Sequence, residues 1–213
     1  MSRKNSLRRK EELRVPKRKF VIFCEGANTE PRYFDALRRQ FKGAIIDVEI
    51  VGGAGVPATI AASASAAMAA AHRTKRRSKQ SFDKNDEVWA VFDEDAHPGV
   101  PQALQQCRNA GVGIAYSNPC FELWLILHRE PFDRPDDRHQ VQKHLQGLCP
   151  EYDRNAGKSP DCVTLVKAVE QAEVLADAQQ ARRIAEGAPS SAPSTTVQDL
   201  TRALRAAHAS FAI

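Results

Sequence analysis

The sequence predicts an α/β protein with a largely parallel sheet of about four strands, flanking helices and a helical C-terminal extension. Short apolar runs typical of strands buried on both faces alternate with segments of helical periodicity. Beyond about residue 130 the pattern becomes helical. Strands separated by helices form βαβ units with right-handed crossovers, which places the strands parallel to one another.

The first half of the chain supplies the strands. Residues 20–24 form a continuously apolar run, and Glu25-Gly26 ends it. Thr29 is expected to cap a helix that has Pro31 in its first turn. The remaining expected elements of this half are a strand over 44–51, a helix over 57–71, a strand over 87–92, a helix over 101–109, a strand over 112–116 and a helix over 120–128.

The second half is expected to be helical over 138–148, 162–186 and 195–207, with residues 187–194 as a linker or capping loop. The basic run (73–79) and residues 81–86 are expected to form a loop. We therefore divide the chain into a disordered basic tail (1–18), an α/β domain (19–130) and a helical extension packed on it (131–213).

Composition sets the class of protein. The chain has 213 residues, 42% hydrophobic and 27% charged, as is usual for a globular protein. No apolar run reaches the roughly 20 residues that span a bilayer, and the basic N-terminus lacks the apolar stretch of a secretory signal. We expect a cytoplasmic protein away from the membrane. The five widely spaced cysteines are expected to be buried, reduced thiols.

Acidic residues follow two of the expected strands. Glu25 ends the first, while Asp93 and Asp95 end the third. Side chains two residues apart on a strand point the same way, and ligands of parallel sheets bind at the carboxyl ends of the strands. Mg²⁺ prefers such oxygen ligands and offsets the repulsion between carboxylates. The sequence therefore predicts a Mg²⁺ (or Mn²⁺) site, although an acidic solvated turn would give the same Asp-Glu-Asp pattern.

Positive charge is concentrated in two segments. Residues 1–19 carry nine Lys and Arg against two Glu. The second segment, within residues 73–79, consists of Arg73, Lys75, Arg76, Arg77 and Lys79. Such runs attract nucleic acid through counterion release. The alternative for each run is a solvated tail or loop without a partner.

Five motifs resemble a known family. They are CEGANTEPRYF (24–34), VFDEDAH (91–97), SNPCFELWLILH (117–128), YDRNAGK (152–158) and APSTTV (192–197). A strand ending in Glu-Gly and a later strand ending in Asp-x-Asp resemble the Toprim domain. The whole set is more similar to the RloB-like family, a Toprim-related group of abortive-infection, anti-phage proteins. The sequence departs from that pattern at Ala27-Asn28 and Ala192, away from the three carboxylates.

The resemblance implies roles for individual residues. Glu25 would be a metal ligand or general acid/base, Asp93 and Asp95 the metal-binding pair, and Lys158 a residue that neutralises charge in the transition state. Glu122, just after the fourth strand, is a further candidate ligand or a helix-dipole contact.

The remaining candidates each have a structural alternative. Glu30 would join the site or make a capping contact, and His97 would reach a phosphate or be solvated. Asn118 would orient a phosphate or close its turn. His128 is expected to be a core or boundary residue.

These features favour a metal-dependent nuclease, an endonuclease acting on RNA, tRNA or DNA in anti-phage defence. The resemblance alone implies an AAA-type ATPase partner. This chain has no GxxxxGK[ST] loop of its own, so any nucleotide-driven regulation would come from that partner. A non-catalytic nucleic-acid-binding or regulatory subunit of an ATPase-containing complex is the first alternative, and a phosphotransfer or nucleotide-processing enzyme is the second. The sequence leaves the oligomeric state open, a homodimer included.

Overall fold

The computed structural model describes residues 18–41, 46–77, 86–94, 98–153, 155–157 and 159–209. Residues 1–17 of the predicted basic tail (1–18) lie outside these ranges, whereas Arg18 belongs to the first strand, so the tail was predicted one residue too long. Four candidate site residues also lie outside: Lys79, Asp95, His97 and Lys158.

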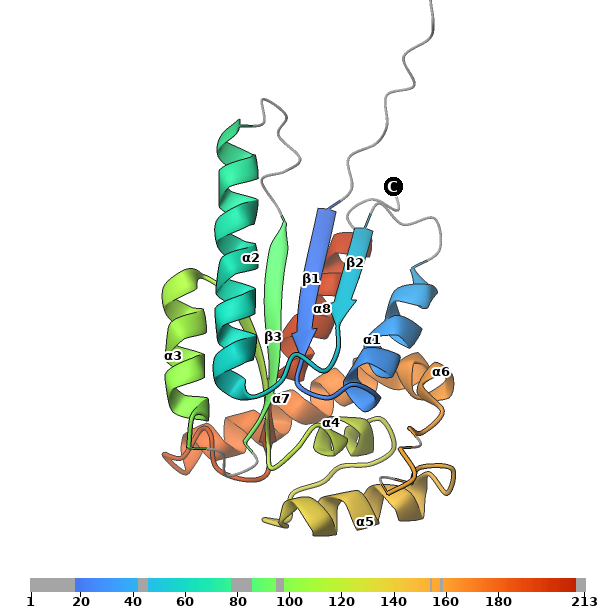
Figure 1. Ribbon diagram of the computed structural model, residues 1–213. Helices are drawn as coiled ribbons and strands as arrows, with labels where there is room; N and C mark the ends of the chain where they lie inside the picture. Colours follow the sequence, from blue (N-terminus) through green and yellow to red (C-terminus); the bar gives the residue numbers. More distant parts are fainter. Residues whose placement is uncertain are drawn as a thin grey trace, which may run out of the picture.

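Figure 1 shows the elements of the fold. The strands are β1 (Arg18–Cys24), β2 (Ile46–Val51), β3 (Glu87–Asp93), β4 (Gly113–Asn118) and β5 (Ser194–Thr195). The helices are α1 (Thr29–Gln40), α2 (Pro57–Arg77), α3 (Val100–Ala110), α4 (Glu122–Leu127), α5 (Arg138–Leu148), α6 (Cys162–Leu165), the 3₁₀ helix η2 (Val166–Ala168), α7 (Val169–Ala185) and α8 (Val197–Ala209).

The strands form one sheet in the order β2-β1-β3-β4-β5. The first four are parallel, as the sequence predicts, and β5 pairs antiparallel with β4. Helices cover both faces, so each central strand is buried on both sides (Figure 1). In β1, Phe20 and Ile22 face a core shared with α1, α4, α7 and α8. Phe23 faces a second core, where Ala90 and Phe92 of β3 pack with α2 and α3.

Two helix predictions were wrong, one in its end and one in its continuity. The helix predicted over 57–71 continues to Arg77, so residues 73–77 are helical rather than part of a loop. Periodicity did not indicate this because the last turns are charged and exposed on every side. The helix predicted over 162–186 is divided into α6, η2 and α7.

The short strand β5 was not predicted. It occupies the start of the segment expected to be helical over 195–207, and α8 begins after it at Val197. The pairing with β5 also explains why β4 is longer than expected. Ser117 and Asn118 pair with Thr195 and Ser194, which extends β4 past the predicted break.

Helix α8 packs against one face of the sheet, whereas α4 and α5 lie beyond the carboxyl ends of the parallel strands (Figure 1). They are not a separate body, because Val141 and Leu145 of α5 and the following Tyr152 are buried in the same core as Phe20 and Ile22. All five cysteines are free and buried, as predicted. In the part of the chain that is described, no helix combines the length and apolar character needed to cross a membrane.

His128, directly after α4, is buried, which confirms its expected core position. Its Nδ1–H donates to the carbonyl oxygen of Trp124 at 2.9 Å, and Nε2 accepts from the Tyr33 hydroxyl at 2.9 Å. This pairing requires the neutral ring. Burial lowers the pKa of His128 to about 4 from its ordinary value of 6.5.

His128 should therefore make stability depend on pH. Below pH 6.5 His128 binds a proton in the unfolded chain but remains neutral in the folded state. The free energy of unfolding therefore falls progressively as the pH is lowered from 6.5 to about 4. Lowering the pH from about 7.5 to about 5 should cost about 2 kcal/mol through this residue. Urea denaturation at both pH values would measure the loss, which His128→Gln should lack. An equal loss in the wild type and the variant would contradict the assignment.

Candidate functional site

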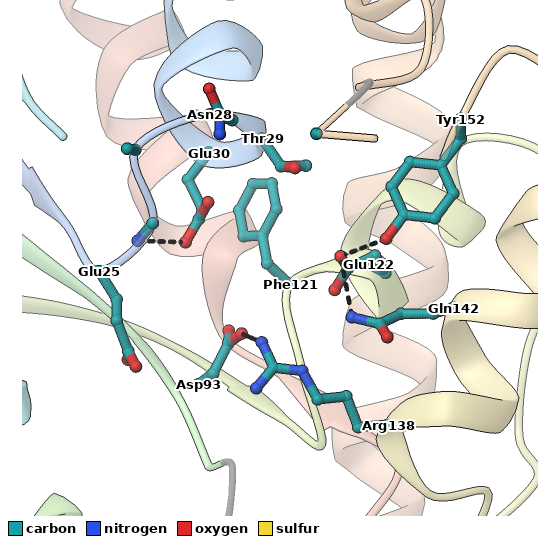
Figure 2. A pocket seen from close by; sticks show the side chains of 13 residues that line it. Glu25, Asn28, Thr29, Glu30, Asp93, Phe121, Glu122, Arg138, Gln142 and Tyr152 are labelled. Atoms are coloured by element: carbon teal, nitrogen blue, oxygen red, sulfur yellow. Dashed lines mark hydrogen bonds and ion pairs between the residues drawn. The ribbon is translucent and has the colours of Figure 1, made fainter. Parts of the chain in front are cut away.

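Four carboxylates come together at the carboxyl edge of the sheet. Glu25 directly follows β1, Asp93 is the last residue of β3, and Glu122 begins α4 just after β4. Glu30 lies in the first turn of α1. All four line one cavity of about 260 Å³ (Figure 2). The predicted proximity of Glu25, Asp93 and Glu122 follows from the parallel sheet, because parallel strands end at the same edge.

The loop between β1 and α1 is organised by Glu30. Its Oε1 accepts a hydrogen bond from the backbone N–H of Gly26 at 3.0 Å. Asn28 occupies the capping position of α1 without a side-chain capping bond, and Thr29 is already helical, so the prediction that Thr29 caps this helix was wrong. Glu30 thus makes a helix-start contact and also lines the cavity.

Glu122 is held from the opposite side of the cavity. Its Oε1 accepts from the Tyr152 hydroxyl at 2.6 Å and from Nε2 of Gln142 at 3.3 Å (Figure 2). Both donors belong to α5 and the segment after it. The helical extension therefore orients one of the carboxylates that the sheet edge brings to the site.

Asp93 faces a cation from the same extension. Nη2 of Arg138, the first residue of α5, lies 3.4 Å from Oδ2 of Asp93 (Figure 2). The start of α5 is fixed by a capping box in which Asp137 and Gln140 bond each other's backbone N–H. Among the described residues, Arg138 is the one Lys or Arg that lines the cavity.

The carboxylates are deeply placed. The exposed fractions of Asp93, Glu30 and Glu122 are 6%, 7% and 7%. Burial raises the pKa of Asp93 well above its ordinary value, and the charges of Glu30 and Glu122 raise it further, while Arg138 opposes them. Burial also raises the pKa of Glu30, against the lowering effect of its backbone hydrogen bonds. The neighbouring carboxylates thus make ionisation of Asp93 and Glu30 harder.

The donor set is the kind that Mg²⁺ or Mn²⁺ binds. The side chains are carboxylates, and their mutual repulsion leaves negative charge that a divalent cation would neutralise. As they lie, the described His, Cys, Asp and Glu side chains form no group of three or more that could hold a metal ion. Asp95, the second member of the predicted pair, is outside the described residues. The metal site stays a prediction.

The predicted basic run is remote from the cavity. Arg73, Lys75 and Arg76 are exposed on the last turns of α2, and the side chain of Arg77 is not described. In Figure 1, α2 runs from the carboxyl edge of the sheet back to the opposite edge. The run from Pro57 to Arg73 spans roughly 24 Å at 1.5 Å per residue. The basic run and the carboxylates are therefore separate surfaces.

Asn118 makes a long-range contact in the structure. Its Nδ2 donates to the carbonyl oxygen of Ser190 at 2.8 Å, which ties the end of β4 to the loop before β5. This role is structural, but it differs from the predicted closing of the turn at Asn118. It is not among the residues that line the carboxylate cavity.

Three residues of the cavity were not foreseen from the sequence. Arg138, Gln142 and Tyr152 come from the helical extension. The Asp137-to-Gln140 capping pattern marks where α5 begins and could have placed Arg138 in a first turn. No local pattern indicates which way α5 packs, so the pairing of these residues with Asp93 and Glu122 could not be read from the chain.

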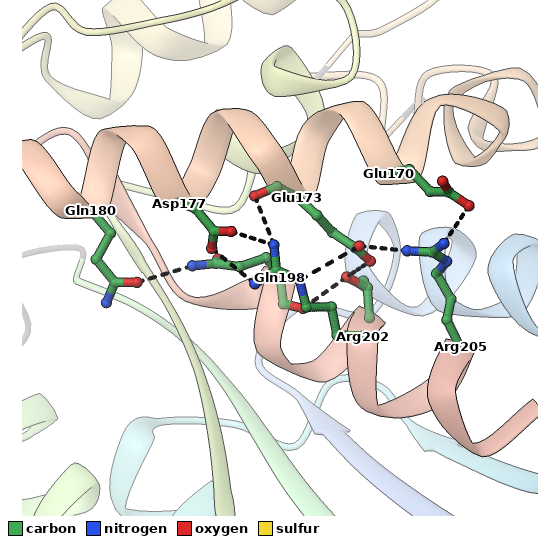
Figure 3. A network of polar contacts seen from close by, with 8 residues as sticks. Glu170, Glu173, Asp177, Gln180, Gln198, Arg202 and Arg205 are labelled. Atoms are coloured by element: carbon green, nitrogen blue, oxygen red, sulfur yellow. Dashed lines mark hydrogen bonds and ion pairs between the residues drawn. The ribbon is translucent and has the colours of Figure 1, made fainter. Parts of the chain in front are cut away.

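A second charged cluster joins α7 to α8 (Figure 3). Oε1 of buried Glu173 accepts from the Thr201 hydroxyl at 2.9 Å, and its Oε2 accepts from Nη1 of Arg205 at 2.5 Å. Arg202 pairs with Asp177 and donates to the backbone oxygen of Glu173 at 3.3 Å. Arg205 also pairs with Glu170. These carboxylates are matched by guanidinium groups, so this cluster fastens two helices, in contrast to the acid-rich cavity.

Glu173→Ala should destabilise the protein by about 2 kcal/mol or more, because it removes the shared partner of two arginines and a buried hydroxyl. The side chain of Glu173 is 4% exposed, whereas that of Asp177 is 49% exposed. Asp177→Ala, which removes a partner of the same Arg202, should cost less than about 1 kcal/mol. Urea denaturation of both variants would test this. Similar costs for the two would mean that Glu173 is not the centre of the network.

Gly26 should be coupled to Glu30. A Cβ at Gly26 would lie 2.5 Å from Oε2 of Glu30, so Gly26→Ala must displace that flexible carboxylate. The lost hydrogen bond should cost about 1 kcal/mol, and this cost should vanish in a Glu30→Ala background. Gly147→Ala is the control, since a Cβ there meets nothing within 4 Å and the helix should gain stability. A full cost in the Glu30→Ala background would refute the coupling.

Comparison with known proteins places the chain in a family. Residues 20–204 match the family model described as RloB-like protein. Comparisons with curated proteins and with solved structures gave no significant match. The matched range contains every described residue of the carboxylate cavity. The family match therefore confirms the resemblance drawn from the motifs, and the chain belongs to the RloB-like family.

Proposed function

We propose that this RloB-like chain is a metal-dependent nuclease, an endonuclease that hydrolyses phosphodiester bonds as an effector of bacterial anti-phage defence. The observation that supports it best is the convergence of Glu25, Glu30, Asp93 and Glu122 on one cavity at the carboxyl edge of a parallel sheet. The proposed relation to the Toprim domain rests on two of these residues, Glu25 after β1 and Asp93 at the end of β3. Family membership supports the defence role and says nothing by itself of catalysis.

In this proposal Glu25, Asp93 and Asp95 hold Mg²⁺ or Mn²⁺, with Glu122 as a further ligand. The ion would orient the scissile phosphate and activate a water molecule. Tyr152 and Gln142 keep the Glu122 carboxylate in place through their hydrogen bonds. Arg138 stands beside Asp93, where a guanidinium balances negative charge. Glu25 doubles as a general acid or base, and Lys158 neutralises charge in the transition state.

The substrate is a nucleic acid, whether RNA, tRNA or DNA, and the protein acts in the cytoplasm. An AAA-type ATPase is the proposed partner, by resemblance to the family. Nucleotide-driven regulation would then come from that partner.

A non-catalytic binding or regulatory subunit is the second candidate. It is favoured by the exposed Arg73, Lys75 and Arg76, which could bind nucleic acid without involving the carboxylates. Under this alternative, affinity should withstand EDTA and Asp93→Asn and should fall steeply with salt. The nuclease should lose turnover on either change while keeping some binding.

The decisive measurement is cleavage of labelled tRNA, single-stranded RNA and duplex DNA with Mg²⁺, Mn²⁺ or EDTA. Cleavage should require the metal and fall by about 10²-fold or more in a Glu25→Gln/Asp93→Asn variant. Glu49→Gln is the matched control, since it removes an exposed carboxylate of β2 that does not line the cavity. Metal-independent cleavage, or full activity in the double variant, would refute the proposal. Inactivity of the wild type, with and without the ATPase and ATP, would favour the binding subunit.

A further inference from the structure

The carboxylate cavity lies between two walls that touch each other. One wall is the loop from β1 to α1, with Ala27 and Asn28, and the other is α5 with the segment that follows it (Figure 2). A Cβ at Gly157 would lie 3.9 Å from the side-chain nitrogen of Asn28. Nearby, Nη1 of Arg32 donates to the Ser159 hydroxyl at 3.5 Å. The cavity is therefore bridged on this side.

The second wall is fixed by the core. Val141, Leu145 and Tyr152 are buried together with Phe121 and Tyr33. The Tyr152 hydroxyl is also bonded to Glu122 at the base of the cavity. Moving this wall outward would expose those apolar side chains to water and break the bond to a buried carboxylate. The wall is thus a permanent part of the site, in contrast to a lid that lifts for each substrate.

The reactive groups lie deep between these walls, since Asp93 and Glu122 are more than nine-tenths buried. The phosphates of a duplex lie on the surface of a stiff rod with a persistence length of about 150 base pairs. Both strands of such a rod must fit between the walls if one of its phosphates is to reach the buried carboxylates. An unpaired strand is narrower and bends freely, and enzymes that do chemistry on a base likewise take single strands or extruded nucleotides.

Arg138 is placed to bind such a strand. Its side chain is 27% exposed and lies at the N-terminus of α5, where the helix dipole favours anions. Its 3.4 Å contact with Asp93 is longer than the roughly 2.7–2.9 Å of a strong charge-assisted hydrogen bond. The exposed part of the side chain leaves a route by which a phosphate with two free oxygens can reach the guanidinium.

We propose that the carboxylate cavity accepts a single unpaired strand of nucleic acid, with Arg138 binding one of its phosphates, and that it excludes intact duplex. This proposal rests on the proposed nuclease function for its cleavage readout. The basic run at the end of α2 is an open surface and has no such restriction.

The first test places one labelled phosphodiester in three contexts, within a single strand, at the centre of a duplex of the same sequence, and in an unpaired bulge of that duplex. RNA and DNA versions would both be used. With Mg²⁺ or Mn²⁺, the single strand and the bulge should be cleaved. Cleavage at the paired site should be slower by about 100-fold or more. Cleavage of the paired site within a few-fold of the single strand would overturn the proposal.

The second test measures binding in Ca²⁺, so it does not depend on turnover. Arg138→Gln should weaken single-strand binding about 10-fold and leave duplex binding unchanged. Arg39→Gln, which removes an exposed guanidinium of α1 that does not line the cavity, should leave both unchanged. Arg73→Gln/Arg76→Gln should weaken duplex binding.

The results of the two tests separate the two proposals. Single-strand binding that is unchanged in Arg138→Gln would overturn the inference even if cleavage occurs. Arg138-dependent single-strand binding without any cleavage would uphold the inference and count against the nuclease alone.

Discussion

The parallel pairing of β1 with β3 is the constraint on which the rest of this structure depends. Their register sets Cys24 opposite Val91, so Glu25 and Asp93 leave the sheet at the same edge. That pairing is stable because residues of each strand enter both cores. The apolar strands thus bring the acids together, and the repulsion among those acids is compensated by the burial of side chains such as Phe20 and Phe92.

The extension after β4 converts a sheet edge into an enclosed site. Without α5 and the segment after it, Glu122 and Asp93 would stand in solvent at the end of an open sheet. Tyr152 and Arg138 instead approach them from the far side of the cavity. The low dielectric that this burial creates strengthens every charge interaction inside, both the unfavourable ones among carboxylates and any favourable one with a cation.

Much of the fold could be predicted because burial on both faces leaves a clear apolar signature in β1 and β3, and α5 was predicted with the bounds it has. The elements that were missed lack local signals. The end of α2 is charged all round, and β5 has two residues whose strand character comes from pairing with β4. In the site, the positions of Glu25 and Asp93 could be predicted because both residues stand at strand ends. The positions of Arg138 and Tyr152 could not be predicted, because they depend on how α5 packs.

The separation of the basic run from the cavity sets a length scale for ligands. The two surfaces stand at opposite ends of α2 (Figure 1), and the segment before that helix is tied to the site by the hydrogen bond from the Gly53 N–H to the Gly26 oxygen, 2.9 Å long. The roughly 24 Å from Pro57 to Arg73 correspond to about seven nucleotides at the 3.4 Å rise of stacked bases, and to fewer in an extended unpaired strand. A shorter oligonucleotide can engage one surface at a time, whereas a longer one can bridge both and gain avidity from the two weak contacts.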